Sequence, residues 1–196
     1  MQLTETLALA DLTAVISVGI AAIVAFTGYQ NTRHASRQTF DNFTLRFIET
    51  ENADPHLYAG RRWLAETAAD PQHDFALYAD IGRFFERAGQ SEQIQVFQGA
   101  DGVQHYTVSD RPEAQKTLAD WLHGREHIRA VVEARNTAAE ALLNGLLEET
   151  AYRLVRSRAV LADFRLLQNH IAARRQNDAG YARAFCELAA RWMQQE

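Results

Sequence analysis

The sequence predicts a mostly α-helical protein: an N-terminal transmembrane helix continues into an amphipathic stalk, followed by a helical bundle with one β-hairpin insertion. An uncharged apolar run lies near the N-terminus, and apolar residues recur every three or four positions through most of the remaining chain. Only 3 prolines and 10 glycines interrupt 196 residues, which favours long helices. We therefore expect an anchor over 1–30, a stalk helix over 31–52 and a helical domain over 53–196, with a hairpin near 93–108.

The anchor is predicted from the 18 uncharged residues Leu12–Tyr29. As a helix they span about 27 Å, close to the roughly 30 Å hydrocarbon core of a bilayer. A cleaved signal peptide would need a positive N-terminal region, whereas only Glu5 and Asp11 are charged before the run. Arg33 and Arg37 follow the run, so the positive-inside rule predicts a single pass through the inner (plasma) membrane, with the N-terminus outside and the domain in the cytoplasm.

Small residues recur on one face of the predicted anchor. Ser17, Ala21 and Ala25 are spaced four residues apart, and such stripes let helix backbones approach closely in lipid. Alanine and serine are also common in anchors that do not associate. Besides the lipid bilayer, the expected partner is a second copy of the chain or a larger membrane complex.

The helical domain is predicted to begin where the stalk ends. Phe40, Phe43, Phe47 and Ile48 have helical spacing and predict an amphipathic stalk. Asp54-Pro55 is typical of a helix N-cap followed by the first helical residue.

Three further regions follow in order. A helix is expected over 75–88, with Gly89 at its C-terminal cap. Residues 93–98 and 103–108 alternate in character around a Gly-containing turn, which indicates a β-hairpin. The second helical block runs from Pro112 to about Glu149, and two more helices follow, the last with Asp178 as its expected N-cap.

Charge is unevenly distributed along the chain. The net charge of −5 argues against a nucleic-acid partner. The C-terminal region is nevertheless rich in arginine, and these residues are candidates for contact with anionic lipid or a phosphorylated ligand. A solvated helix surface with intramolecular ion pairs is the alternative. The candidates are Arg153, Arg156, Arg158, Arg174 and Arg175.

One short motif suggests metal chemistry. His123, Glu126 and His127 match H-x-x-E-H, in which two histidines on one helix face bind zinc and the glutamate activates water. Gly124 weakens a helix at this point, and five letters arise easily by chance. We expect an exposed polar face here, with no metal and no cofactor.

Three stretches resemble a family of bacterial single-pass membrane proteins that carry a helical domain of unknown function. They are "RHASRQTFDNF", "LLNGLLEETAYRL" and "IAARRQNDAGYARAFCELAARW", and the resemblance covers about a third of the chain. It implies a membrane anchor and a helical domain, and it implies no chemistry.

Three hypotheses about function follow. The first is a non-enzymatic, membrane-tethered helical interaction module or accessory subunit of a membrane assembly. The second is a membrane effector, for example in defence, that senses a nucleotide-like signal. The third is a zinc-dependent hydrolase that uses the H-x-x-E-H motif at 123–127.

Overall fold

The computed structural model describes residues 41–99 and 104–195. From Thr44 onward they form one compact unit that is mostly helical and contains a small two-stranded sheet. The predicted combination of a helical domain with one hairpin is therefore confirmed.

The predicted anchor over 1–30 lies outside the described residues, as do positions 31–40 of the predicted stalk. The same holds for the small-residue face of Ser17, Ala21 and Ala25. Within the described ranges, no helix combines the length and apolar character needed to cross a bilayer.

Residues 41–53 are helical and belong largely to the compact unit. The buried side of this helix carries Thr44, Ile48 and Glu51. The sequence pattern instead favoured a phenylalanine face, yet Phe47 is only partly buried. The difference arises because the helix contacts the unit partly through polar groups: the Thr44 hydroxyl accepts a hydrogen bond from the Glu148 amide at 2.8 Å.

The next helix, α2, spans Pro55–Thr67 and begins as predicted. The Asp54 side chain accepts hydrogen bonds from two backbone amides of the first turn, and Pro55 occupies a position where no amide donor is needed. Gly60 lets α2 approach α4 (Pro112–Leu143) closely, because a Cβ atom there would lie 2.7 Å from the His127 carbonyl oxygen.

The segment predicted as one helix over 75–88 is two elements. A 3₁₀ helix, η1, spans Phe75–Ala79, and α3 spans Ile81–Arg87. The single-helix prediction was wrong because Asp80 adopts an extended conformation between them, and its side chain caps the start of α3. Gly89 has a φ of 68°, as expected for a C-terminal cap.

The hairpin is confirmed. After a short 3₁₀ turn, η2 (Ser91–Gln93), strands β1 (Ile94–Gln98) and β2 (Gln104–Val108) pair antiparallel, with Val96 opposite Tyr106. The hairpin packs on α3 through β1 and on α4 through β2, which supplies the support that an isolated two-stranded sheet lacks.

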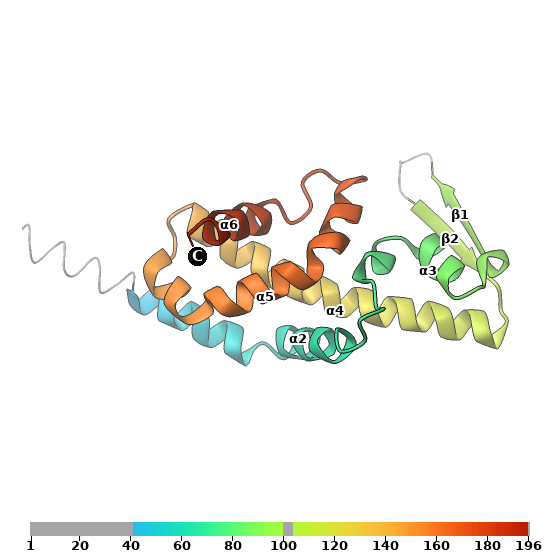
Figure 1. Ribbon diagram of the computed structural model, residues 1–196, viewed down its shortest axis with the longest axis horizontal. Helices are drawn as coiled ribbons and strands as arrows, with labels where there is room; N and C mark the ends of the chain where they lie inside the picture. Colours follow the sequence, from blue (N-terminus) through green and yellow to red (C-terminus); the bar gives the residue numbers. More distant parts are fainter. Residues whose placement is uncertain (1–40, 100–103, 196) are drawn as a thin grey trace, which may run out of the picture. The chain divides into compact units, whose positions relative to one another are not determined.

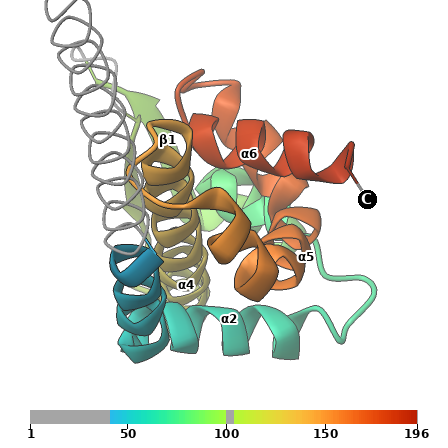
Figure 2. The ribbon, with the colours of Figure 1, turned by 90° about the vertical axis from the view of Figure 1, so that its left-hand side faces the viewer.

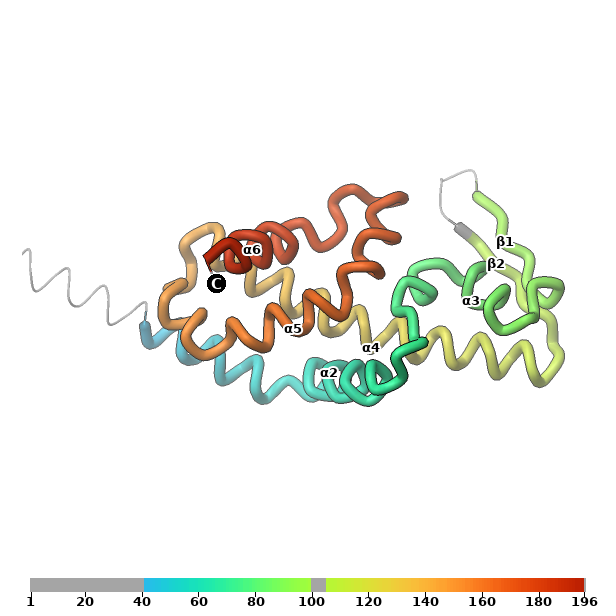
Figure 3. The backbone as a smooth tube through the Cα atoms, in the orientation of Figure 1, coloured from blue at the N-terminus to red at the C-terminus, as the bar shows by residue number. Residues whose placement is uncertain are grey.

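Helix α4 is the element around which the unit is built (Figure 1). It contacts α2, α5 (Glu149–Arg175) and α6 (Arg183–Met193). Figure 2 shows α2 and α6 on different sides of α4 and α5, and Figure 3 follows the chain from the hairpin at one end of α4 to the turn into α5 at the other.

Two predicted helix boundaries differ in the structure. The second block ends at Leu143 rather than near Glu149, because Gly145 takes a φ of 69° and the chain turns into α5. Asp178 does not cap α6: its side chain accepts from the Gly180 amide, and the N-cap is Ala182 with a φ of 51°.

Helix α6 closes the core. Phe185, Leu188 and Trp192 are buried along one stripe, because their spacing places them on one face of the helix. The indole nitrogen of Trp192 donates to the Glu149 carboxylate at 2.7 Å, which anchors the end of α6 to the start of α5.

Candidate functional site

The H-x-x-E-H residues lie on α4, but only the two histidines meet. The Nε2 atoms of His123 and His127 are 3.2 Å apart, and the Trp63 ring stacks on His127 with a centroid separation of 5.5 Å. Glu126 instead lines a pocket with Asp54, and neither His123 nor His127 borders that pocket. Among the described residues, no group of three or more His, Cys, Asp or Glu side chains is placed to hold a metal ion. The zinc-hydrolase hypothesis therefore gains no third ligand from them.

The predicted arginines do not form one surface. Arg153 bonds to the Gln195 side chain, Arg174 lies over the Tyr181 ring, and Arg158 and Arg175 are exposed. Of the five candidates, only Arg156 reaches the buried charge cluster described next.

The charge cluster is centred on Arg135 of α4, whose side chain is 1% exposed. Its Nη1 atom donates to Glu51 Oε1 at 2.9 Å, and its Nε atom donates to Asp163 Oδ2 at 2.8 Å. Glu51 comes from helix 41–53 and Asp163 from α5. One guanidinium thus joins three helices through two carboxylates.

Two groups from α5 complete the surroundings of Glu51. The Tyr152 hydroxyl donates to both carboxylate oxygens, at 2.9 and 3.0 Å. The Arg156 Nε atom lies 3.4 Å from Oε2, and the same guanidinium donates to the Ile48 carbonyl at 3.1 Å. Burial, followed by the Glu51 charge, raises the pKa of Tyr152 well above its ordinary value. The phenol therefore stays protonated and keeps donating.

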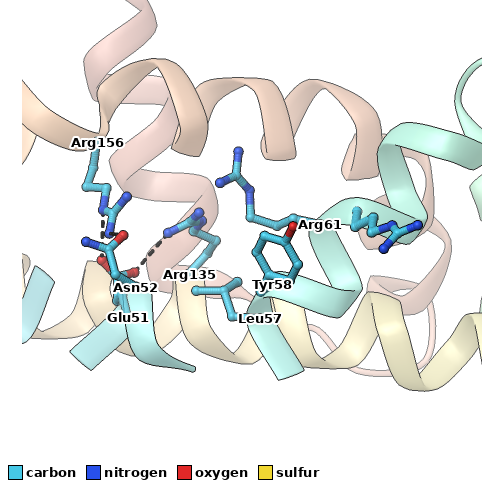
Figure 4. Close-up of a pocket in the computed structure, with 8 residues that line it drawn as sticks. Glu51, Asn52, Leu57, Tyr58, Arg61, Arg135 and Arg156 are labelled. Atoms are coloured by element: carbon cyan, nitrogen blue, oxygen red, sulfur yellow. Dashed lines mark hydrogen bonds and ion pairs between the residues drawn. The ribbon is translucent and has the colours of Figure 1, made fainter. Parts of the chain in front are cut away.

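The outer side of the cluster opens into a pocket of about 320 Å³ (Figure 4). Arg61 of α2 borders this pocket and donates to Asp163 Oδ1 at 3.1 Å. Its side chain is 38% exposed, so this end of the cluster reaches solvent. The lining residues are Glu51, Asn52, Leu57, Tyr58, Arg61, Arg62, Arg135 and Arg156.

Charge is nearly balanced in the cluster. Three guanidiniums, those of Arg61, Arg135 and Arg156, face two carboxylates. Burial acts to lower the pKa of Arg135, but the carboxylates of Asp163 and Glu51 outweigh it, and the pKa is raised. Each buried charge is paired with an opposite charge and forms directional hydrogen bonds, so the cluster holds the helices together.

This cluster was not predicted from the sequence, although the sequence contains a signal for it. Arg135 occupies an apolar-stripe position of α4, in register with Ile128, Val131 and Ala139. A cation at such a position is buried and requires carboxylates from neighbouring helices. The pattern does not predict which carboxylates pair with Arg135, because Glu51 and Asp163 are 84 and 28 residues away from it along the chain.

A family model described as a domain of unknown function, DUF4760, matches residues 15–192. The chain belongs to the DUF4760 family. The predicted likeness to a family of unknown function is thus confirmed, and it extends over nearly the whole chain rather than a third. The DUF4760 match includes Glu51, Arg135 and Asp163. No curated protein and no solved structure matches the chain.

Proposed function

We propose that this DUF4760 protein is a non-enzymatic, membrane-tethered helical module that self-associates and so serves as a subunit of a larger membrane assembly. A single span over 12–29 would place the N-terminus outside and the domain in the cytoplasm, at the inner membrane. The uncharged run and its two following arginines support the span. The family match begins at residue 15, so residues 15–29 of this run lie within the matched range.

The observation that carries the proposal is the attachment of helix 41–53 to the rest of the domain. This helix follows the proposed anchor in the chain, and Glu51 ties it to Arg135 of α4 and Tyr152 of α5. A flexible tether would need no buried charge on it. A helix fixed at both Thr44 and Glu51 is instead an integral part of the folded domain, so residues 44–53 are not a flexible tether.

The test is the mass of the full chain extracted from membranes in mild detergent, measured by native mass spectrometry. We expect a homo-oligomer. Replacing Ser17, Ala21 and Ala25 with leucine should convert it to monomers, because bulky side chains prevent close approach of the helices. Ala22→Leu is the matched control: it adds a leucine about 100° away from the centre of that face and should leave the oligomer intact.

A wild-type chain that is monomeric in the membrane extract would contradict the proposal. So would an oligomer that survives all three leucine substitutions, since association would then not depend on the small-residue face.

A further inference from the structure

A second cavity, of about 570 Å³, lies outside the charge cluster. It is bordered by the hairpin, η1, the start of α3, α4, and the end of α5 with the residues that follow it. Its size falls within the range of small-molecule sites, roughly 300–1,000 Å³. The residues that matter for its chemistry are Tyr106, Trp121, Arg125, Arg174, Asn177 and Asp178.

Two of these residues are arginines held by aromatic rings. The Arg125 guanidinium carbon lies 4.9 Å from the centroid of the Trp121 ring, and that of Arg174 lies 5.4 Å from the Tyr181 ring. A ring positions a guanidinium through its face and leaves the N–H groups at its edge available. In the part of the chain that the structure describes, neither guanidinium forms an ion pair with a carboxylate.

This arrangement differs from the cluster around Arg135, where each guanidinium is already bound to a protein carboxylate. An anion entering the first pocket would have to displace Glu51 or Asp163. In the second cavity the two cations have no such competitor. Arg125 and Arg174 line the same cavity, and burial, followed by the Arg174 charge, lowers the pKa of Arg125.

The other titratable groups nearby do not cancel this positive charge. Asp178 is one carboxylate against two guanidiniums, and its Oδ1 atom accepts from the Gly180 amide at 3.0 Å. His170 is buried between the Phe75 carbonyl and the Tyr181 hydroxyl. Burial lowers its pKa to about 4, so it is neutral at pH 7.

We propose that this cavity binds a small phosphate monoester, with Arg125 and Arg174 donating to the phosphate oxygens. Guanidinium groups suit this ligand because their N–H pairs match two oxygens at once. The Asn177 side chain and the Asp178 carboxylate are available to a polar body attached to the phosphate. The site is independent of the proposed membrane module, and the failure of either would leave the other standing.

The test uses the full chain in mild detergent and isothermal titration calorimetry with AMP as the probe, with adenosine as the phosphate-free control. We expect saturable binding of AMP and none of adenosine. Arg125→Gln and Arg174→Gln should each weaken AMP binding at least tenfold, because each removes a charged donor while keeping a polar, uncharged side chain. Arg129→Gln is the matched control: it removes an exposed arginine on the same helix and should change the affinity less than twofold.

A second measurement does not depend on any variant. AMP at saturating concentration should raise the melting temperature of the wild-type chain, since a ligand that binds only the folded state stabilises it. Inorganic phosphate should compete with AMP if the phosphate group carries the recognition. Absence of saturable AMP binding would overturn the proposal, as would equal binding of adenosine. Equal weakening by Arg129→Gln would also overturn it, because the effect would then be general charge attraction.

Discussion

At the scale of single residues, Arg135 shows how a buried charge depends on its surroundings. Its guanidinium is almost without solvent contact, and it bonds to Glu51 and Asp163 on two other helices. Such a cluster contributes less stability than its Coulomb attraction suggests, because Arg135, Glu51 and Asp163 lost hydration on burial. Its members depend on one another: removing one leaves its buried partners with fewer opposite charges and hydrogen bonds.

Replacing Arg135 with methionine should therefore lower the free energy of unfolding by about 3–5 kcal/mol, because two carboxylates would remain buried without their shared cation. Urea unfolding of the full chain in mild detergent measures this. Arg129→Met is the control on the same helix. Its 3.7 Å ion pair with Glu133 is exposed, so the change should cost less than about 1 kcal/mol. Equal unfolding midpoints for the two variants would show that the cluster is not buried as described.

His170 predicts a dependence of stability on pH. Its Nδ1 atom lies 3.2 Å from the Phe75 carbonyl, which only accepts, so Nδ1 carries the proton and Nε2 accepts from the Tyr181 hydroxyl. Burial lowers the pKa from 6.5 to about 4, so the folded state favours neutral imidazole and the unfolded state binds more protons between these values. The contribution is complete above pH 6.5 and is lost as the pH falls toward 4.

The difference of roughly 2.5 pKa units corresponds to about 3 kcal/mol. The test measures the free energy of unfolding in urea at pH 7 and at pH 4.5 for wild type and for His170→Gln. Between these two pH values, wild type should lose about 2–3 kcal/mol more than His170→Gln. The comparison cancels the other groups that titrate in this range. Identical losses in the two proteins would mean that His170 does not resist protonation in the folded state.

At the scale of elements, helices and strands were predicted correctly where several neighbouring residues indicate the same structure. The start of α2 follows from Asp54 and Pro55, and the hairpin follows from alternation on both sides of a turn. Two of the boundaries that failed lie where an aspartate side chain can bond to more than one backbone amide. Asp80 caps α3 and so interrupts the helix expected over 75–88. Asp178 accepts a hydrogen bond within a turn, and α6 starts later, at Arg183.

The candidate sites were harder to predict than the elements. Periodicity places Arg135 on the buried stripe of α4, but it contains no information about which helices face that stripe. The same limit applies to Arg125 and Arg174, which lie on α4 and α5 and meet at one cavity only through the tertiary arrangement. Of the arginines that the sequence singled out, Arg156 and Arg174 lie at pockets, and the sequence offered no means of separating them from the exposed Arg158 and Arg175.

At the scale of the whole molecule, the proposed anchor leads to a testable prediction: on which side of the membrane the domain lies. Arg33 and Arg37 follow the uncharged run, and neither lysine nor arginine precedes it. Positive charge next to a span is retained on the cytoplasmic side, so residues 30–196 should all lie in the cytoplasm. A fluorescent reporter that matures only in the cytoplasm, fused after Glu196, should be bright in intact bacteria. Alkaline phosphatase, which needs the periplasm, should be inactive at the same position.

Charge should control this result. Two lysines inserted before Leu7 place the same number of positive charges on both sides of the run, and a mixed population with both reporters partly active is expected. Two glutamines at the same place are the control and should leave the wild-type pattern, because acidic and neutral residues have little influence on orientation. High phosphatase activity in the unmodified fusion would reverse the assignment. The charge cluster and the proposed phosphate site would then face the periplasm, where any ligand would have to be found.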